Sequence, residues 1–206
     1  MRDLIVLVPA KPFAAAKSRL APVLSPTARQ SLSREFLKRT IGLVRKALPD
    51  AGLAITTSEP AIPALAPGCT VLPDGAGDLN GALDAARRAV LTTGRHRLLV
   101  LPTDLPFLSA DELRRMAAPA SGIRLAPDRR CDGTNAILLE AEASARFRFC
   151  MGPRSYAAHI VEAARLGLPF EQLDAPGLAF DVDLPEDFAA WRAGGENPDG
   201  QNGAAA

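Results

Sequence analysis

A short basic segment near the N-terminus carries the strongest chemical signal in this sequence. Lys11, Lys17 and Arg19 lie between positions 11 and 19, with Ser18 beside them. The chain has only four lysines against 20 arginines, so two lysines in one segment are a local concentration. Cations and a hydroxyl that follow a first strand predict a phosphate-binding loop, with a solvated basic loop as the alternative. The glycine spacings of a Walker loop and of a dinucleotide-binding turn are absent.

Three aspartates form the second chemical signal. Asp104 follows the apolar run 98–101, while Asp181 and Asp183 alternate along an extended segment and share one face of it. Carboxylates suit Mg²⁺, which is commonly held by one or two of them together with substrate phosphates. The alternative is that Asp104 and Asp183 only cap neighbouring helices. Together with the basic segment, the aspartates predict metal-assisted chemistry on a phosphate ester.

Alternating strands and amphipathic helices must position these residues. Apolar runs predict strands at 4–8, 52–57, 69–72, 97–101, 123–126, 136–139 and 178–182. Helical periodicity and capping signals predict helices at 26–48, 82–91, from Ser109 onward, 156–166 and 185–191. This order predicts an α/β fold with a mostly parallel central sheet flanked by helices, and ligands beyond the carboxyl ends of its strands. We therefore expect the site in the loops 9–19, 74–81, 102–108, 127–135, 150–155 and 183–185.

Composition limits the class of protein. A chain of 206 residues predicts one domain, which we place at 1–193, and the polar composition of 194–206 predicts a disordered tail. The net charge of +1 provides no surface for nucleic acid, and no apolar run approaches the ~20 residues that span a membrane. Three scattered cysteines and two distant histidines predict neither a disulfide framework nor a zinc site. We expect a cytoplasmic enzyme; a homodimer stays open.

Seven short motifs, taken in order, resemble the CofC/FbiD guanylyltransferases of coenzyme F420 biosynthesis over about residues 4–190. They are VPAKP (8–12), AKSRL (16–20), GDLNGAL (77–83), TDLP (103–106), APDR (126–129), GTN (133–135) and DVDLPED (181–187). The resemblance implies a single-domain nucleotidyltransferase that is Rossmann-like and related to the GT-A and MobA folds. It further implies transfer of GMP from GTP to 2-phospholactate, phosphoenolpyruvate or 3-phosphoglycerate, with release of pyrophosphate.

The resemblance also implies residue roles. GTP would be held by Lys11, Lys17, Ser18, Arg19, Asp78 and Asn80. The acceptor would lie at Thr134, Gly152 and Ser155, and Mg²⁺ at Asp104, Asp183 and Asp181. Of these, Lys17, Arg19 and Asp104 would be catalytic. The family usually has glycine where this chain has Arg154.

The expected chemistry needs no general base, because the attacking phosphate is already an anion; the protein must instead neutralise charge and fix the approach. We therefore expect no catalytic histidine, with a supporting or a packing role for His159, and a structural role for Cys150. Two rival functions stay open: a molybdenum-cofactor-type nucleotidyltransferase, whose Gly-Gly loop is absent here, and a catalytically silent nucleotide-binding regulator. The next transferase of the F420 pathway is an expected partner.

Overall fold

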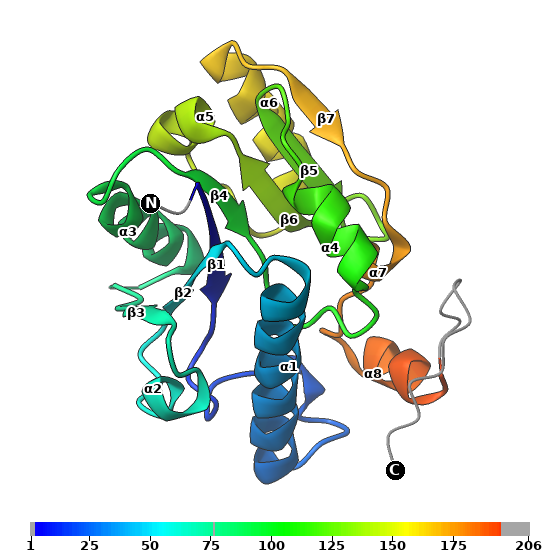
Figure 1. Ribbon diagram of the computed structural model, residues 1–206. Coiled ribbons are helices and arrows are strands. Elements are labelled where there is room, and N and C mark those ends of the chain that lie inside the picture. Colours follow the sequence, from blue (N-terminus) through cyan, green and yellow to red (C-terminus); the bar gives the residue numbers. More distant parts are fainter. Residues whose placement is uncertain (1–2, 76, 195–206) are drawn as a thin grey trace.

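The computed structural model describes residues 3–75 and 77–194, and Figure 1 shows how their helices and strands are arranged. The strands are β1 (Leu4–Pro9), β2 (Gly52–Thr56), β3 (Thr70–Leu72), β4 (Arg97–Val100), β5 (Ile123–Pro127), β6 (Thr134–Leu139) and β7 (Phe170–Gln172). The helices are α1 (Pro26–Ala47), α2 (Ile62–Leu65), α3 (Leu79–Leu91), α4 (Ala110–Ala117), α5 (Ala141–Arg146), α6 (Ser155–Leu166), α7 (Pro176–Ala179) and α8 (Pro185–Arg192), with a 3-10 turn η1 (Ser18–Leu20). The tail predicted at 194–206 lies outside the described residues except for its first position.

A single sheet with the strand order β3-β2-β1-β4-β6-β5-β7 forms the centre of the described chain. β1 pairs in parallel with β2 and β4, β2 with β3, and β5 with β7. β6 pairs antiparallel with both β4 and β5, so it runs against all the other strands. The mostly parallel sheet predicted from the sequence is therefore confirmed.

Both faces of the sheet are covered, because its strands bury apolar side chains on alternating sides. Val6 and Val8 of β1 face the cluster that contains the apolar positions of α1 and α4. Leu7 of the same strand faces the opposite cluster, formed with α3, α5 and α6. A third, smaller cluster packs Leu20 and Phe36 against the α8 region. The two sides are visible in Figure 1, where α1 and α4 lie in front of the sheet.

Local signals fix where several helices begin and end. The Ser25 side chain accepts a hydrogen bond from the Ala28 amide, and Pro26 occupies the first turn of α1. Ser109 and Glu112 form the predicted capping box of α4. Gly167 ends α6 in the left-handed conformation, where the lack of a Cβ avoids strain.

The prediction of a strand at 178–182 was wrong. Residues 176–179 form the short helix α7, and the chain then continues extended, with one backbone hydrogen bond from the Val182 amide to the Asp104 carbonyl. Leu178 and Val182 are both fully buried, which produced the apolar signal. However, Pro176 favours a helical turn, and the carbonyls of Leu178 and Ala179 accept from the Asn135 side chain. The Ala179 carbonyl also accepts from the Arg129 amide, so isolated hydrogen bonds hold this segment in place of a strand ladder.

Other elements differ from the prediction in smaller ways. The seventh strand is the edge strand β7, whose three residues are all exposed and so carry no apolar pattern. Helix α3 begins at Leu79, three residues before the predicted start, and the short helices α2 and α5 were not predicted. Within the described residues, no helix has the length and apolarity required for a membrane span.

Candidate functional site

Two adjoining cavities lie at the edge of the sheet where the parallel strands end. The first, which we call the β1–α3 cavity, has a volume of about 610 Å³ and is lined by the loop after β1, the start of α3 and Asp104. The second, the β6–α6 cavity, has about 600 Å³ and is lined by Thr134, Gly152 and Ser155 among others. Lys11, Lys17, Asp78, Leu79 and Asp183 line both. Because β6 runs backward, its first residue reaches this same edge.

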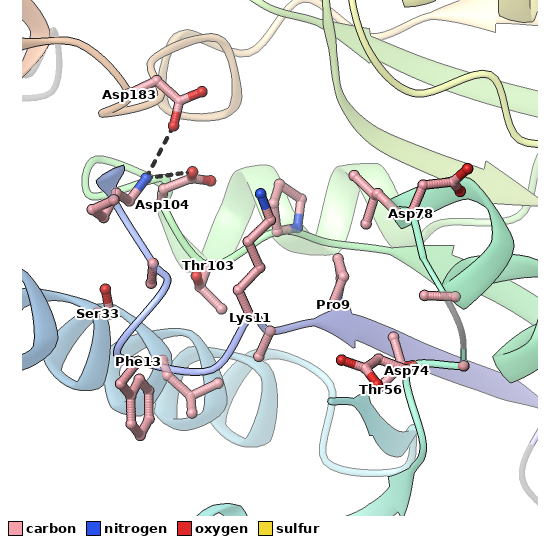
Figure 2. Close-up of a pocket in the computed structure, with 18 of the residues that line it drawn as sticks. Pro9, Lys11, Phe13, Ser33, Thr56, Asp74, Asp78, Thr103, Asp104 and Asp183 are labelled. Atoms are coloured by element: carbon pink, nitrogen blue, oxygen red, sulfur yellow. Dashed lines mark hydrogen bonds and ion pairs between the residues drawn. The ribbon is translucent and has the colours of Figure 1, made fainter. Parts of the chain in front are cut away.

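Lys17 lies at the centre of the site, where the two cavities meet. Its Nζ donates to Asp104 Oδ2 at 2.6 Å, to Asp183 Oδ1 at 3.2 Å and to the Val182 carbonyl at 2.6 Å. Figure 2 shows both carboxylates pointing toward this ammonium. Burial works to lower the pKa of Lys17, but the charges and hydrogen bonds of the two carboxylates raise it above its ordinary value. The lysine is therefore held as a cation.

Asp181 adds a third carboxylate beside this pair. Burial, followed by the charges of Asp104 and Asp183, raises the pKa of Asp181 to about 6. Its Oδ1 accepts a weak hydrogen bond from Asn135 Nδ2 at 3.4 Å. The three aspartates predicted from the sequence are thus close enough for the charges of Asp104 and Asp183 to act on Asp181.

The donor set of this site fits a hard divalent cation. Asp104 and Asp183 present carboxylate oxygens to one shared positive group, the Lys17 ammonium, at the place where the two cavities meet. Among residues 3–75 and 77–194, no group of three or more acidic, histidine or cysteine side chains is arranged so that it could hold a metal ion. Mg²⁺ is usually held by one or two carboxylates together with substrate phosphates and water, so the magnesium site stays a prediction.

The remaining basic residues of the N-terminal segment lie around the same point. Lys11 extends into the β1–α3 cavity (Figure 2) and lines the second cavity as well. Arg19 is largely exposed, with its Nη1 3.6 Å from Asp183 Oδ2, and Ser18 lines the β6–α6 cavity. Lys17 adopts the left-handed conformation at φ 53°, which turns the chain into η1. The segment therefore supplies three cations to one edge of the sheet.

Asp78 and Asn80 make structural contacts at the start of α3. Asp78 caps the helix, with its Oδ1 accepting from the Gly81 amide at 2.7 Å. The Asn80 side chain makes two hydrogen bonds to the Met151 backbone, donating to the carbonyl at 3.1 Å and accepting from the amide at 2.6 Å. Their predicted contact with the nucleotide stays a prediction; the geometry shows that Asn80 ties α3 to the loop 150–155.

The predicted acceptor residues lie together in the β6–α6 cavity. Ser155 Oγ lies 3.3 Å from Thr134 Oγ1, and both residues are buried. Gly152 has a φ of 129°, which L side chains rarely adopt, so this loop position requires glycine. Arg154 has a φ of 56°, and its amide donates to Asp132 Oδ2 at 3.1 Å.

Two supporting residues were missed from the sequence. Asn135 holds the segment that carries Asp181 through its bonds to Leu178 and Ala179. Asp187, almost fully buried, accepts from the amides of Asp183 and Leu184 at 3.0 and 2.8 Å. Its position, three residues after Leu184 at the start of a helix, is the local signal that could have identified it.

The fold of this chain is that of solved transferases, which include a putative nucleotide-diphospho-sugar transferase from Desulfovibrio desulfuricans with a TM-score of 0.71 at 18% identity, covering 96% of this chain and 89% of that one. A solved nucleotidyl transferase from Methanothermobacter thermautotrophicus superposes with a TM-score of 0.67 at 15% identity, covering 94% of this chain and 98% of that one. At that identity the likeness concerns the fold.

Sequence comparison then identifies the family. Residues 4–202 match the family "Guanylyl transferase CofC like", and the chain belongs to it. It is 37% identical over 189 residues to a phosphoenolpyruvate guanylyltransferase of Chloroflexus aggregans, covering 88% of this chain and 93% of that protein. It is 32% identical over 187 residues to a 2-phospho-L-lactate guanylyltransferase of Methanothermobacter thermautotrophicus, covering 88% and 81%. The family resemblance inferred from the seven motifs is confirmed.

Proposed function

We propose that this protein transfers the GMP part of GTP to a small phosphorylated carboxylic acid and releases pyrophosphate. The observation that carries the proposal is the Lys17 ammonium bound between Asp104 and Asp183 where two cavities meet. One cavity has room for a nucleotide, and the other contains hydroxyl groups and a glycine turn suited to a small anion. Family membership and the names of the curated relatives support the same reaction.

The bond changes of this reaction are simple. A phosphate oxygen of the acid attacks the α-phosphorus of GTP and forms a new phosphoanhydride bond. The bond from the α-phosphorus to the bridging oxygen breaks, and pyrophosphate leaves with the electron pair. Because the attacking oxygen is already ionised near neutral pH, no proton has to be removed. The barrier lies in bringing two polyanions together in line.

The chain's own residues address that barrier by supplying positive charge. Lys11 and Arg19 flank the junction of the cavities and would bind the triphosphate. The Lys17 ammonium would leave the carboxylates and bind the phosphates when the nucleotide is present. Asp104 and Asp183, assisted by Asp181, would hold Mg²⁺, which would neutralise phosphate charge when bound.

The first experiment measures pyrophosphate release with GTP and Mg²⁺ and each of phosphoenolpyruvate, 2-phospholactate and 3-phosphoglycerate. The downstream transferase is added to draw off unstable product, and ATP replaces GTP as the nucleotide control. Release with one acid and GTP supports the proposal and identifies the acceptor. If GTP binds but no pyrophosphate is released with any of the three acids, the proposal is refuted in favour of a nucleotide-binding regulator.

A pair of aspartate variants tests the site itself. Asp104→Asn removes a carboxylate that contacts Lys17, so we expect it to abolish turnover and weaken Mg²⁺-dependent GTP binding with the fold intact. Asp111→Asn is the matched control, because Asp111 lies exposed in the first turn of α4. A near-normal rate for Asp104→Asn would remove Asp104 from the metal site.

A further inference from the structure

A chain of hydrogen bonds runs through the fully buried side chain of His159 to the acceptor cavity. The amide of Cys150 donates to His159 Nε2 at 3.0 Å. On the other side of the ring, Nδ1 lies 3.0 Å from Thr134 Oγ1, and Thr134 Oγ1 lies 3.3 Å from Ser155 Oγ. His159 is 0% exposed, and Thr134 and Ser155 are 5% and 1% exposed. The chain therefore begins at a backbone amide and ends at two hydroxyl groups that line the β6–α6 cavity.

The Cys150 amide decides which ring nitrogen carries the proton. A backbone N–H can only donate, so Nε2 must present a lone pair. A neutral imidazole has one N–H, which is then on Nδ1 and donates to Thr134 Oγ1. Burial lowers the pKa of His159 to about 4, despite the opposing charge of Glu162, so the ring is neutral at pH 7.

The two hydroxyl groups have two protons between them. One is used in the bond between Ser155 and Thr134, whichever of the two donates. The second cannot go to His159 Nδ1, because that atom is itself a donor. Across the described part of the chain, neither hydroxyl makes any further hydrogen bond. One hydroxyl proton is therefore left for whatever occupies the cavity.

We propose that His159 is a positioning residue that makes the Thr134–Ser155 pair an obligate donor to an anionic oxygen of the acceptor. In the opposite tautomer, Nδ1 would accept a hydrogen bond from the Thr134 hydroxyl. Both hydroxyl protons of the pair would then be used within the protein, and none would be left for the ligand. The same histidine binds the backbone at Cys150, the first residue of the loop 150–155, so it also fixes the position of Gly152 and Ser155. This inference rests on the proposed function, since it concerns the acceptor subsite of that reaction.

The tautomer can be measured on the ligand-free protein without any assay of activity. The chain has only two histidines, so ¹⁵N chemical shifts of the imidazole rings, assigned with a His159→Gln sample, resolve the ring nitrogens of His159. We expect a neutral ring with its proton on Nδ1 at pH 7. A proton on Nε2, or on both nitrogens, would overturn the inference whatever the protein catalyses.

Two variants separate proton donation from packing. An asparagine amide reaches the position of Nδ1, so His159→Asn keeps a donor for Thr134. A glutamine amide reaches the position of Nε2, so His159→Gln keeps an acceptor for the Cys150 amide and loses that donor. The two hydroxyls keep their protons in this variant, but no donor holds Thr134 Oγ1, so the spare proton is no longer directed toward the ligand. With phosphoenolpyruvate as acceptor, or whichever acid supports turnover, we expect His159→Gln to raise the acceptor KM about tenfold or more. We expect His159→Asn to stay within about threefold, and the GTP KM to change little in both. Equal effects of the two variants, or equal effects on both KM values, would indicate a packing role and refute the inference.

A double variant completes the test. If His159 acts through the hydroxyl pair, adding His159→Gln to Thr134→Val should raise the acceptor KM no further. Additive effects would contradict the inference. If the wild-type protein releases pyrophosphate and the two histidine variants behave alike, the inference fails while the proposed function stands. If the wild-type protein is silent with all three acids, the proposed function fails and the assignment of this ligand fails with it.

Discussion

Replacing His159 by glutamine should make the stability of the protein less sensitive to acid. Burial holds the pKa of the imidazole near 4 in the folded state, against 6.5 in an unfolded chain. Between these values the unfolded state binds a proton that the folded state does not. The stabilisation is therefore complete above pH 6.5 and is lost as the pH falls toward 4. Linkage between the two pKa values gives a loss of about 2 kcal/mol in the free energy of unfolding between pH 7.5 and pH 5.

Urea unfolding of the wild-type protein and of His159→Gln at these two pH values measures the effect. All other titrating groups are shared, so their contributions largely cancel when the two pH dependences are subtracted. We expect the wild-type protein to lose about 2 kcal/mol more than the variant on acidification. At pH 7.5 the free energy of unfolding of the variant should be lower by about 1–3 kcal/mol, because the buried Thr134 hydroxyl loses its hydrogen bond from His159 Nδ1. Equal losses on acidification would show that the folded protein accepts a proton at His159, which would refute the reasoning about a neutral ring.

Three further substitutions probe the site. Lys17→Met should lower the free energy of unfolding by about 2 kcal/mol at pH 7, measured in urea, because it leaves Asp104 without its cation. Since the folded pKa of Lys17 is raised, this stabilisation is complete below about pH 10.5 and disappears above it, so the two proteins should converge in alkaline urea titrations. Ser155→Ala should raise the acceptor KM far more than the GTP KM in steady-state assays; the reverse ranking would mean that the two subsites are interchanged. Asn80→Ala should follow the same ranking, because the Asn80 side chain holds the Met151 backbone; a larger effect on GTP would restore its predicted contact with the nucleotide.

The parts of the fold that the sequence predicted are those with a local physical cause. Buried parallel strands such as β1 must be short apolar runs, and helices such as α1 and α4 carry their own caps. β7 could not be predicted in this way, because all its residues are exposed at the sheet edge. The strand prediction for 178–182 was wrong because the buried residues Leu178 and Val182 belong to a helical turn and to the extended chain after it. Burial of both residues gave the same apolar pattern as a strand.

The residues of the site were easier to predict than their contacts. Charged and hydroxyl side chains at strand ends stood out in the sequence, and the structure brings them to one edge. However, the bond from Lys17 to Asp104 joins positions 87 residues apart, and nothing local in the sequence encodes such a distance. The same holds for Asn80, whose partner is the backbone of Met151, a group that has no sequence signature.

The reversed direction of β6 has a consequence for how this site can diverge. The basic segment and Asp104 follow forward-running strands, whereas Thr134 stands at the start of the reversed strand β6, in a hairpin with β5. The loop 128–133 of that hairpin is only a few residues long and lines the β6–α6 cavity. If the acid binds there, as we propose, changes in the length or sequence of this loop would alter its pocket while β1 and β4 keep their register. Under the proposed function, this topology would let related proteins differ in the phosphorylated acid that they use while they keep the same residues for the nucleotide.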